Sequence, residues 1–540
     1  MINQGLPSKK IVIFGGGIAG LTVAHECAEA GLEIHVYEKE NICGGKAQGY
    51  RNPEGFHVEH SLRVYTSSYF SLFDTMKRVP YKGKTIFDNL VPVEGLILKS
   101  VKKIIPEAFV PRLFSVSQLE KNLAGARSLR AWGIPWSEIL YLFWELSTFV
   151  MKSQERLRKN VWPYSFEDYI QLHKRSPAFQ LYLKTLVSII VAAKPTASAP
   201  LILDLLARTI VFHSYRYGIK GVQSTINALN GPTNERFIDP WVDYLKSLGV
   251  KFYMNSALED LEIENGKVRE AVMADRSHVN ADAYVLALNY KSVKKFIPNF
   301  DAFEQLHHEW SFGMQFYLNA IPAMDIKNSC FNLVLDSPWD VVYLLEAPPL
   351  WKDVALHPST KAILSVTLSN IENVGIVYHK PFHECTREEV YEEVLAQTGF
   401  DKCKDLIIQS SLDPRMLYLT KEEWEEQKNK YENSEWEICP STKGGHRWVF
   451  NSPLYIAQPG THDQMPTVKT SIDHLFLAGE YIKTPYLIPT MEKANESGKL
   501  CAKELCDYFG RTYNDSRLIP PELPMATIRK IDTLLFRLFR

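Results

Sequence analysis

A glycine motif near the N-terminus could hold the phosphates of a dinucleotide. Gly15, Gly17 and Gly20 have the spacing GxGxxG and directly follow an apolar run at residues 11–14. In such a motif the first glycine makes a tight turn, the second lets a pyrophosphate approach the backbone, and the third lets a helix pack against its strand. Glu38 follows eighteen residues after Gly20, where a carboxylate can accept hydrogen bonds from both ribose hydroxyls. This combination predicts a dinucleotide site.

The elements around the motif indicate how these residues are held in place. After the apolar run, residues 21–30 are expected to form a helix that Gly31 ends, and residues 34–37 a second strand. Similar α/β patterns return at residues 235–298 and at residues 475–506. The N-terminal, middle and C-terminal segments therefore predict an α/β fold in which three separated pieces form one Rossmann-like domain.

A second glycine pair lies just beyond the ribose carboxylate, in the segment Gly44-Gly45-Lys46. Further blocks follow at residues 58–69 (VEHSLRV and then Tyr69), residues 229–287, and residues 475–503, which contain LFLAGEY and PTMEKA. In this order, the blocks resemble the FAD-dependent phytoene-desaturase and flavin amine-oxidase superfamily. Lys46 is similar to the plant and cyanobacterial type of carotenoid desaturase. The resemblance implies FAD as the cofactor and a Rossmann-like FAD-binding domain.

The same resemblance assigns matching residues to parts of FAD. The Gly-Gly-Lys segment would wrap the pyrophosphate, Leu258 would support the adenine, and Glu480 would hold the ribityl chain. The backbone at Met491 would stabilise negative charge at the flavin N1–C2 carbonyl, because a helix is expected to begin there. The cofactor-binding residues that we predict are Gly15, Gly17, Ala19, Gly20, Glu38, Lys39, Gly45, Lys46, Arg63, Val64, Tyr69, Leu258, Gly479, Glu480 and Met491.

The blocks and the segments between them also predict the domain boundaries. Residues 70–215 carry long apolar-aromatic segments broken by prolines, which predict mostly helices, and Asn265-Gly266 predicts a hairpin. The expected parts are an FAD-binding domain from residues 1–80, 230–300 and 465–510, a helical substrate- and membrane-facing subdomain at residues 81–229, a β-rich substrate domain at residues 301–464, and a basic amphipathic tail at residues 511–540.

A flavin can take a hydride from an amine carbon, from an allylic C–H or from a reduced nicotinamide. Amine oxidases of the superfamily usually carry Tyr where Thr490 stands, and a central-strand Lys that residues 309–319 (EWSFGMQFYLN) do not offer. A second GxGxxG for NAD(P)H is also missing. The prediction is therefore desaturation of a long apolar polyene or carotenoid-type lipid by hydride transfer to flavin N5. A redox-neutral double-bond isomerase of a lipid is the first alternative; an amine oxidase and a non-catalytic flavoprotein are further ones.

Two residues are candidates for catalysis beside the flavin. His60 could receive a proton while the flavin takes a hydride. In desaturases that this chain resembles, an Arg of the middle segment lies near the substrate; Arg208 is the counterpart that we favour, with Arg216 as the alternative. The site would be an apolar tunnel in which positioning and exclusion of water do most of the work.

Composition argues against several other classes of protein. With 61 Lys plus Arg against 62 Asp plus Glu, the net charge is −1, so no nucleic-acid partner is expected. Eight cysteines lie too far apart for a disulfide scaffold, and no Cys/His group has zinc-site spacing, so we expect reduced thiols and no metal. The longest apolar stretch, residues 139–151, is shorter than the about 20 residues that span a bilayer.

A hydrophobic substrate would have to come from lipid, and two segments could contact a membrane. The C-terminal tail has apolar residues at helical spacing with basic residues between them, which is typical of an interfacial helix. They are Ile528, Ile531, Leu534, Leu535 and Leu538, with Arg529, Lys530, Arg537 and Arg540. Residues 96–114 repeat this theme with Lys99, Lys102 and Lys103. We therefore expect a cytoplasmic protein, peripheral on a membrane, whose flavin is reoxidised by a quinone or by oxygen.

Overall fold

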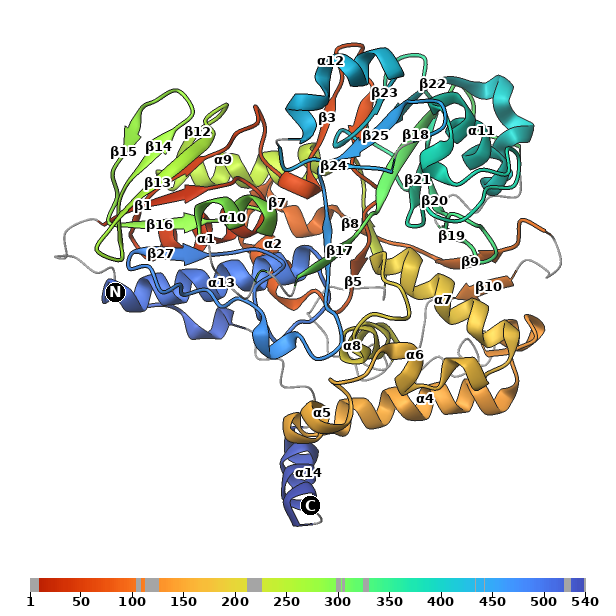
Figure 1. Ribbon diagram of the computed structural model, residues 1–540, viewed down its shortest axis with the longest axis horizontal. Coiled ribbons are helices and arrows are strands. Elements are labelled where there is room, and N and C mark those ends of the chain that lie inside the picture. The colour runs from red at the N-terminus through yellow and green to blue at the C-terminus, as the bar shows by residue number, and fades with distance from the viewer. Residues whose placement is uncertain are drawn as a thin grey trace.

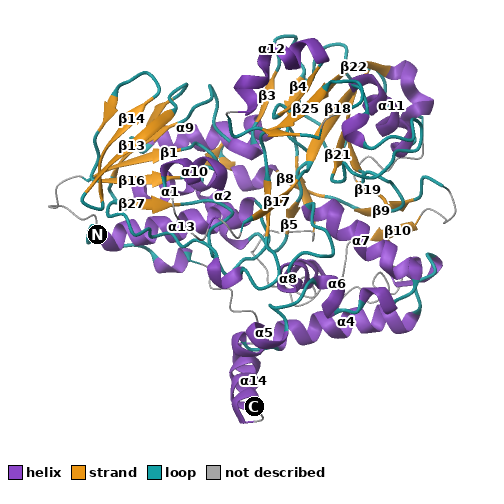
Figure 2. Cartoon of the chain, viewed as in Figure 1, coloured by secondary structure: helices purple, strands orange, loops and turns teal. Residues whose placement is uncertain are grey.

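The computed structural model describes residues 9–102, 108–111, 126–210, 226–297, 303, 306–323, 330–432, 434–440, 442–518 and 526–538. Within these residues, two larger β-sheets occupy one side of the molecule and a group of helices lies at the other side (Figure 2). The last helix, α14 (Ala526–Leu538), projects away from the rest of the chain (Figure 1).

A parallel sheet collects strands that are far apart in the sequence. Its described strands, in spatial order, are β12 (Lys251–Tyr253), β2 (Glu33–Tyr37), β1 (Lys10–Phe14), β16 (Ala283–Leu286) and β27 (Leu475–Leu477). Phe14 pairs with Tyr37 on one side and with Leu286 on the other. Parallel strands are covered on both faces, which explains the nearly unbroken apolar sequences of β1, β16 and β27. The predicted Rossmann-like domain made of N-terminal, middle and C-terminal segments is thus confirmed.

Helices cover this sheet and approach one another closely. α1 (Ile18–Glu29) follows β1 directly and packs against α13 (Met491–Tyr508). Gly498 permits this contact, because a Cβ at that position would lie 2.7 Å from the Ala19 carbonyl oxygen. The other elements in this part are α2 (Phe70–Arg78), a π-helical turn at Asn234–Ile238, α9 (Asp239–Ser247) and α10 (Tyr290–Phe296).

A mixed sheet lies beside the Rossmann-like domain. Its described strands, in spatial order, are β10 (Ala108–Pro111), β9 (Gly95–Lys99), β19 (Cys330–Val334), β20 (Val342–Glu346), β21 (Ala362–Leu368), β18 (Phe312–Leu318) and β22 (Ile407–Leu412). Alternate residues enter different cores, as the two-residue repeat of a strand requires. Leu333 and Val342 belong to the main core, whereas Val334 and Tyr343 pack in a second core with α11 (Arg387–Thr398).

The helical group consists of α4 (Trp136–Met151), α5 (Gln154–Asn160), α6 (Phe166–Tyr169), α7 (Pro177–Val191) and α8 (Ala199–Ile210). α14 is attached to this group through Asp532, which accepts hydrogen bonds from Arg156 Nε at 2.9 Å and from the Ser153 backbone N–H at 2.7 Å. Among the described residues, none of the helices combines the length and the apolar character that crossing a bilayer would require.

Smaller sheets connect these parts. They are β13 (Leu258–Glu264) with β14 (Lys267–Met273) and β15 (His278–Val279); β5 (Tyr65–Thr66) with β11 (Ile226–Leu229) and β8 (Leu90–Pro92); β23 (Met416–Leu419) with β25 (Arg447–Phe450) and β24 (Glu437–Ile438); β3 (Gly49–Arg51) with β4 (His57–Glu59); β17 (His307–Glu309) with β26 (Leu454–Ile456); and β6 (Pro80–Tyr81) with β7 (Lys84–Thr85). Between β23 and β24 lies α12 (Lys421–Glu432).

Most of the local predictions agree with these bounds, and two do not. The helix after the glycine motif and the hairpin at Asn265-Gly266 are confirmed. The expectation of helices is wrong for residues 80–111, which contain β6 to β10, and the amphipathic segment predicted at residues 96–114 contains β9 and β10 instead. β9 pairs with β19, so its apolar residues serve sheet packing. Lys103, Arg216 and Arg540 lie outside the described residues.

Candidate functional site

The glycine turn between β1 and α1 shows two kinds of glycine. A Cβ on Gly15, whose φ is +106°, would lie 2.4 Å from the Ala287 carbonyl oxygen, and one on Gly20 would lie 2.0 Å from the Gly15 carbonyl oxygen. Both positions therefore need glycine for the fold itself. A Cβ on Gly17 would come no closer than 3.8 Å to any neighbour, the Gly45 Cα. The space in front of Gly17 is thus left open by the protein.

Two helix N-termini open onto the same region without a side-chain cap. Gly17 is the N-cap residue of α1 and Thr490 that of α13, and neither helix has a side-chain hydrogen bond to its first turn. The acidic residue of the α13 first turn, Glu492, accepts instead from the backbone N–H groups of Ser71 and Leu72 in α2, both at 2.8 Å. Free N–H groups at a helix start favour an anion or a partly negative oxygen.

Glu38 stands at the end of β2, beside the glycine turn. Its Oε2 accepts from the Gly16 backbone N–H at 2.7 Å and its Oε1 from the Glu40 N–H at 3.0 Å. The carboxylate is buried, yet it lines the cavity described below. Each oxygen retains a further acceptor position, which is what binding of two adjacent hydroxyls requires.

Lys46 connects the second glycine pair to the C-terminal block. Its Nζ donates to Glu480 Oε1 at 2.5 Å and also to the Pro453 carbonyl oxygen. Nearby, Arg63 donates to the Lys46 carbonyl oxygen at 2.8 Å and to Ser61 Oγ at 2.9 Å. The contact between Lys46 and Glu480 therefore joins two residues that lie 434 positions apart in the sequence.

One large cavity of about 1170 Å³ runs past all of these groups. Of the predicted cofactor-binding residues, those that line it are Gly15, Gly17, Ala19, Glu38, Lys39, Gly45, Lys46, Arg63, Val64, Tyr69, Leu258, Gly479, Glu480 and Met491. Gly20 is absent from the lining because it faces Gly15 and Ala287. Pockets for one small ligand usually hold about 300–1,000 Å³. The cavity thus has room for a dinucleotide and a second molecule.

Beyond the polar end, the cavity continues between the helical group and the mixed sheet. Its apolar walls come from α4, α7, α8, β9, β19 and β20. They include Leu142, Leu146, Leu186, Leu205, Leu206, Leu96, Leu98, Phe331, Leu333 and Val342. Trp136, Leu140, Phe143 and Ile190 also line the cavity and are exposed at the molecular surface, so they mark its mouth.

His60 lines the same cavity. Its Nδ1 contacts a carboxylate oxygen of Asp413, which is fully buried, and its ring stacks at 6.4 Å on Phe450. Burial lowers the pKa of His60, and the neighbouring Asp413 opposes this only in part. The imidazole is therefore held neutral and oriented by a fixed carboxylate.

Arg208 does not line the cavity. Its Nε donates to Asp204 at 2.8 Å within α8, and its guanidinium lies 4.6 Å from the ring centre of Tyr486, which does line the cavity. Both members of the ion pair are buried. The role near the substrate that we predict for Arg208 would thus have to act through Tyr486.

Several lining residues were not predicted from the sequence. They are Arg415, Ser434, Glu435, Trp436, Asn451, Ser452 and Tyr486. Arg415 Nη2 donates to Gln48 Oε1 at 3.1 Å, beside the second glycine pair. None of these residues carries a local motif, and the Asp413 that orients His60 lies 353 residues away from it.

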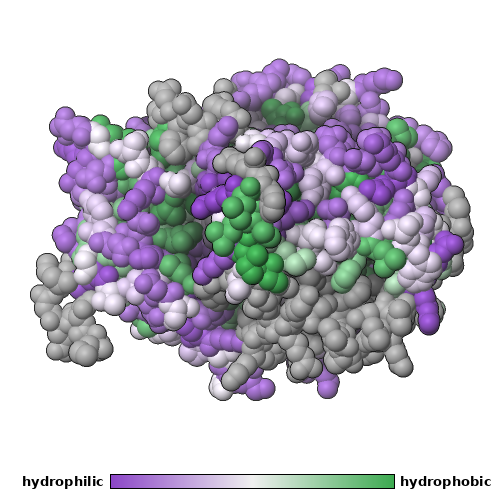
Figure 3. Space-filling model, turned by 90° about the horizontal axis from the view of Figure 1, so that it is seen from below, coloured by the Kyte–Doolittle hydropathy of each residue, from purple (hydrophilic) through white to green (hydrophobic). Residues whose placement is uncertain are grey.

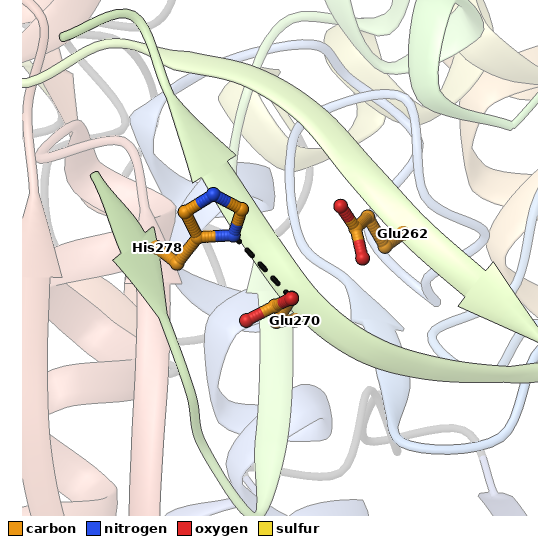
Figure 4. A group of neighbouring side chains, drawn as sticks. All are labelled: Glu262, Glu270 and His278. Atoms are coloured by element: carbon orange, nitrogen blue, oxygen red, sulfur yellow. Dashed lines mark ion pairs between the residues drawn. The ribbon is translucent and has the colours of Figure 1, made fainter. Parts of the chain in front are cut away.

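A possible metal-binding group lies away from the cavity, on the sheet of β13, β14 and β15. Glu262, Glu270 and His278 bring ligand atoms close together there (Figure 4). Arg269 lies 3.5 Å from Glu262 and 3.9 Å from Glu270, and His278 Nδ1 lies 3.3 Å from Glu270. Arg269 and His278 therefore already contact these carboxylates within the protein, and of the three residues in the group only His278 is exposed.

Comparisons with known proteins cover nearly the whole chain. Residues 13–79 match the family model described as an NAD(P)-binding Rossmann-like domain. A probable zeta-carotene desaturase of Synechococcus elongatus is 23% identical over 92% of this chain and 98% of its own. A 15-cis-phytoene desaturase of Glycine max is 22% identical over 92% of this chain and 79% of its own.

Solved structures show the same architecture. A putrescine oxidase bound to putrescine superposes with a TM-score of 0.60 at 11% identity, covering 93% of this chain and 99% of its own. A putative protoporphyrinogen oxidase from Exiguobacterium gives 0.57 at 14% identity, with the same coverage of 93% and 99%. The resemblance found in the sequence motifs is confirmed: along 92% of its length the chain is similar to zeta-carotene and phytoene desaturases, and its fold is that of these oxidases.

Proposed function

We propose that this protein is an FAD-dependent oxidoreductase that desaturates a long carotenoid-type polyene. The observation that carries the proposal is the cavity, in which a dinucleotide-binding end joins an apolar end large enough for a second molecule. The relatives named as carotene and phytoene desaturases support the choice of substrate class.

The residues at the polar end fit FAD. The open face of Gly17 and the uncapped start of α1 suit a pyrophosphate, and Glu38 suits the ribose of the adenosine. Glu480, held by Lys46, would contact the ribityl chain, and the uncapped start of α13 would face the flavin N1–C2 carbonyl. FAD would supply hydride acceptance at N5.

The remaining chemistry belongs to the side chains. Apolar walls position an alkyl chain and exclude water, which a substrate without charged groups requires. His60 would take a proton at Nε2, because Asp413 contacts Nδ1 and so holds the ring proton there.

A redox-neutral isomerase would use the same cavity. The absence of a Tyr at Thr490 and of a Lys in β18 speaks against amine oxidation.

The proposal predicts a yellow protein that a polyene reduces. Purified protein should show the absorption bands of oxidised flavin, and anaerobic addition of 15-cis-phytoene or zeta-carotene should bleach them. Extracted product should weigh two hydrogens less than the substrate. An unchanged mass with a rearranged double bond would favour the isomerase. A flavin that no polyene bleaches would favour a non-catalytic flavoprotein, and peroxide release from amines would favour an amine oxidase.

The location that we propose is the surface of a membrane on the cytoplasmic side, with a quinone or oxygen as the electron acceptor. The cavity mouth carries exposed Trp136, Leu140 and Phe143 on α4. α14 adds an exposed apolar face, and Figure 3, viewed from the side on which α14 projects, shows hydrophobic surface gathered near the centre of that side. A lipid-borne polyene and a lipid-borne quinone would both reach the mouth from the bilayer.

A Lys46→Met variant should bind FAD about tenfold more weakly, because Glu480 loses the charged donor that orients it. Titration of apoprotein with FAD, followed by flavin fluorescence, measures the change. Lys483→Met is the matched control: Lys483 lies near the same block but pairs with exposed Asp463 at 2.8 Å and does not line the cavity. Equal affinities of the two variants would contradict the assigned role of Lys46.

A further inference from the structure

A short segment of the β23–β25–β24 unit covers the polar end of the cavity. We call residues 434–437 the strap. Ser434, Glu435 and Trp436 line the cavity together with Lys39 and Leu258. Since Lys39 directly follows the ribose carboxylate Glu38, this is the end at which a dinucleotide places its adenosine. The strap therefore lies over the adenosine end rather than over the flavin end.

Glu435 fastens the strap to the Rossmann-like domain. Its carboxylate contacts Lys39 Nζ and Ser292 Oγ, and Asn451 Nδ2 donates to it at 3.3 Å. Burial alone would raise the pKa of Glu435, but Lys39 and these donors outweigh burial and lower the pKa to about 2. The carboxylate is consequently ionised at any pH at which the protein works.

Glu437 fastens the other end of the strap. It accepts hydrogen bonds from Trp310 Nε1 and from His308 Nε2, both at 2.8 Å, and it pairs with Lys291 of α10. Trp436 between the two carboxylates is half-buried, and its ring meets Tyr431 of α12 edge-on at 5.6 Å. Two ion pairs thus connect a strap from one unit to Lys39 and α10 of another.

We propose that the strap is a clasp that retains the adenosine half of the cofactor, with the Glu435–Lys39 ion pair as its closing contact. The inference rests on the proposed FAD enzyme and adds residues that no glycine motif contains. An enclosed adenosine can leave only after the strap separates from Lys39 and Ser292, so the clasp acts mainly on the rate of cofactor dissociation. In this proposal Lys39 contributes to cofactor retention through its ion pair with Glu435 of the strap.

The test compares FAD with two ligands that each contain one half of it. In a Glu435→Gln variant, the dissociation rate of FAD should rise about tenfold, and the affinity for ADP, which contains only the adenosine half, should fall about tenfold. The affinity for FMN, which contains only the flavin half, should stay unchanged. Stopped-flow dilution with flavin fluorescence gives the FAD rate, and calorimetry gives the affinities for ADP and FMN.

Three variants control the experiment. Glu425→Gln removes a carboxylate on α12 that pairs with exposed Lys428 at 2.7 Å, and this variant should change no rate. Lys39→Met should reproduce the effect of Glu435→Gln, and the double variant should show no further increase, because both remove the same contact. Thermal unfolding of each apoprotein shows that the variants are folded.

The outcomes separate the two proposals. If the wild-type chain binds no FAD, the proposed function fails. If the wild-type chain binds FAD while Glu435→Gln releases FAD at the wild-type rate and binds ADP with wild-type affinity, only the clasp is refuted. An equal loss of FMN affinity would also refute it, because the strap would then shape the whole cavity and not the adenosine end.

Discussion

A Gly17→Ala variant is expected to fold as stably as the wild-type chain and yet to bind FAD about a hundredfold more weakly, equivalent to ~3 kcal/mol. Gly17 has φ −77° and ψ −179°, which alanine adopts without strain, and its Cβ would find no atom within 3.8 Å. The fold therefore does not require glycine here. The methyl group would, however, occupy the space in which the pyrophosphate approaches the start of α1.

Gly20→Ala provides the contrast within the same motif. Its Cβ would lie 2.0 Å from the Gly15 carbonyl oxygen, so this variant should lose stability by about 1–3 kcal/mol whether or not FAD is present. Urea unfolding of both apoproteins, together with FAD titration, separates the two effects. If Gly17→Ala bound FAD with wild-type affinity, the pyrophosphate could not lie on Gly17, and the placement of the cofactor would be wrong.

The polar end of the cavity could be predicted because its signals are local. The glycine spacing and Glu38 lie within one βαβ unit, whose geometry follows from the order of its elements. The blocks around Lys46 and Glu480 were found by resemblance, and the structure joins them by one ion pair. Each of these residues stands at the end of a strand or at the start of a helix, where sequence patterns are strongest.

The strap could not be predicted, because its position depends on contacts between distant parts of the chain. Glu435 contacts Lys39 across 396 residues, and although Lys39 adjoins the motif residue Glu38, nothing in the sequence around Glu435 indicates this contact. The contact of Asp413 with His60 could not be predicted from the sequence for the same reason. Such contacts result from how the β23–β25–β24 unit sits on the Rossmann-like domain, and no local propensity encodes that arrangement.

Two other results show where sequence patterns mislead. An amphipathic helix is predicted where the structure has β9, a strand that lies between β10 and β19 and whose side chains alternate between the two faces of the sheet. The predicted substrate role of Arg208 rests on resemblance alone. The i,i+4 spacing of Asp204 and Arg208 on one helix was visible in the sequence and indicates the ion pair that the structure contains.

A Trp144→Ser, Leu534→Ser, Leu538→Ser triple variant is expected to bind anionic lipid vesicles at least about a hundredfold more weakly than the wild-type chain. The three side chains are 66%, 61% and 77% exposed, on α4 and α14. None of them lines the cavity, so the cofactor site stays intact. Half-inserted apolar side chains each contribute about 1 kcal/mol to membrane binding, and three together account for the expected loss. Vesicle sedimentation at several lipid concentrations measures it.

The matched control places the same change on exposed apolar side chains elsewhere. Ile263, Val374 and Ile408 are 38%, 52% and 39% exposed and lie on β13, in a loop and on β22, away from α4 and α14. An Ile263→Ser, Val374→Ser, Ile408→Ser variant should sediment with vesicles as the wild-type chain does. Equal losses in both triple variants would mean that exposed apolar area in general drives the binding. The cavity mouth at Leu140 and Phe143 would then have no fixed orientation toward the bilayer, and a polyene would have to reach it through water, where its solubility is lowest.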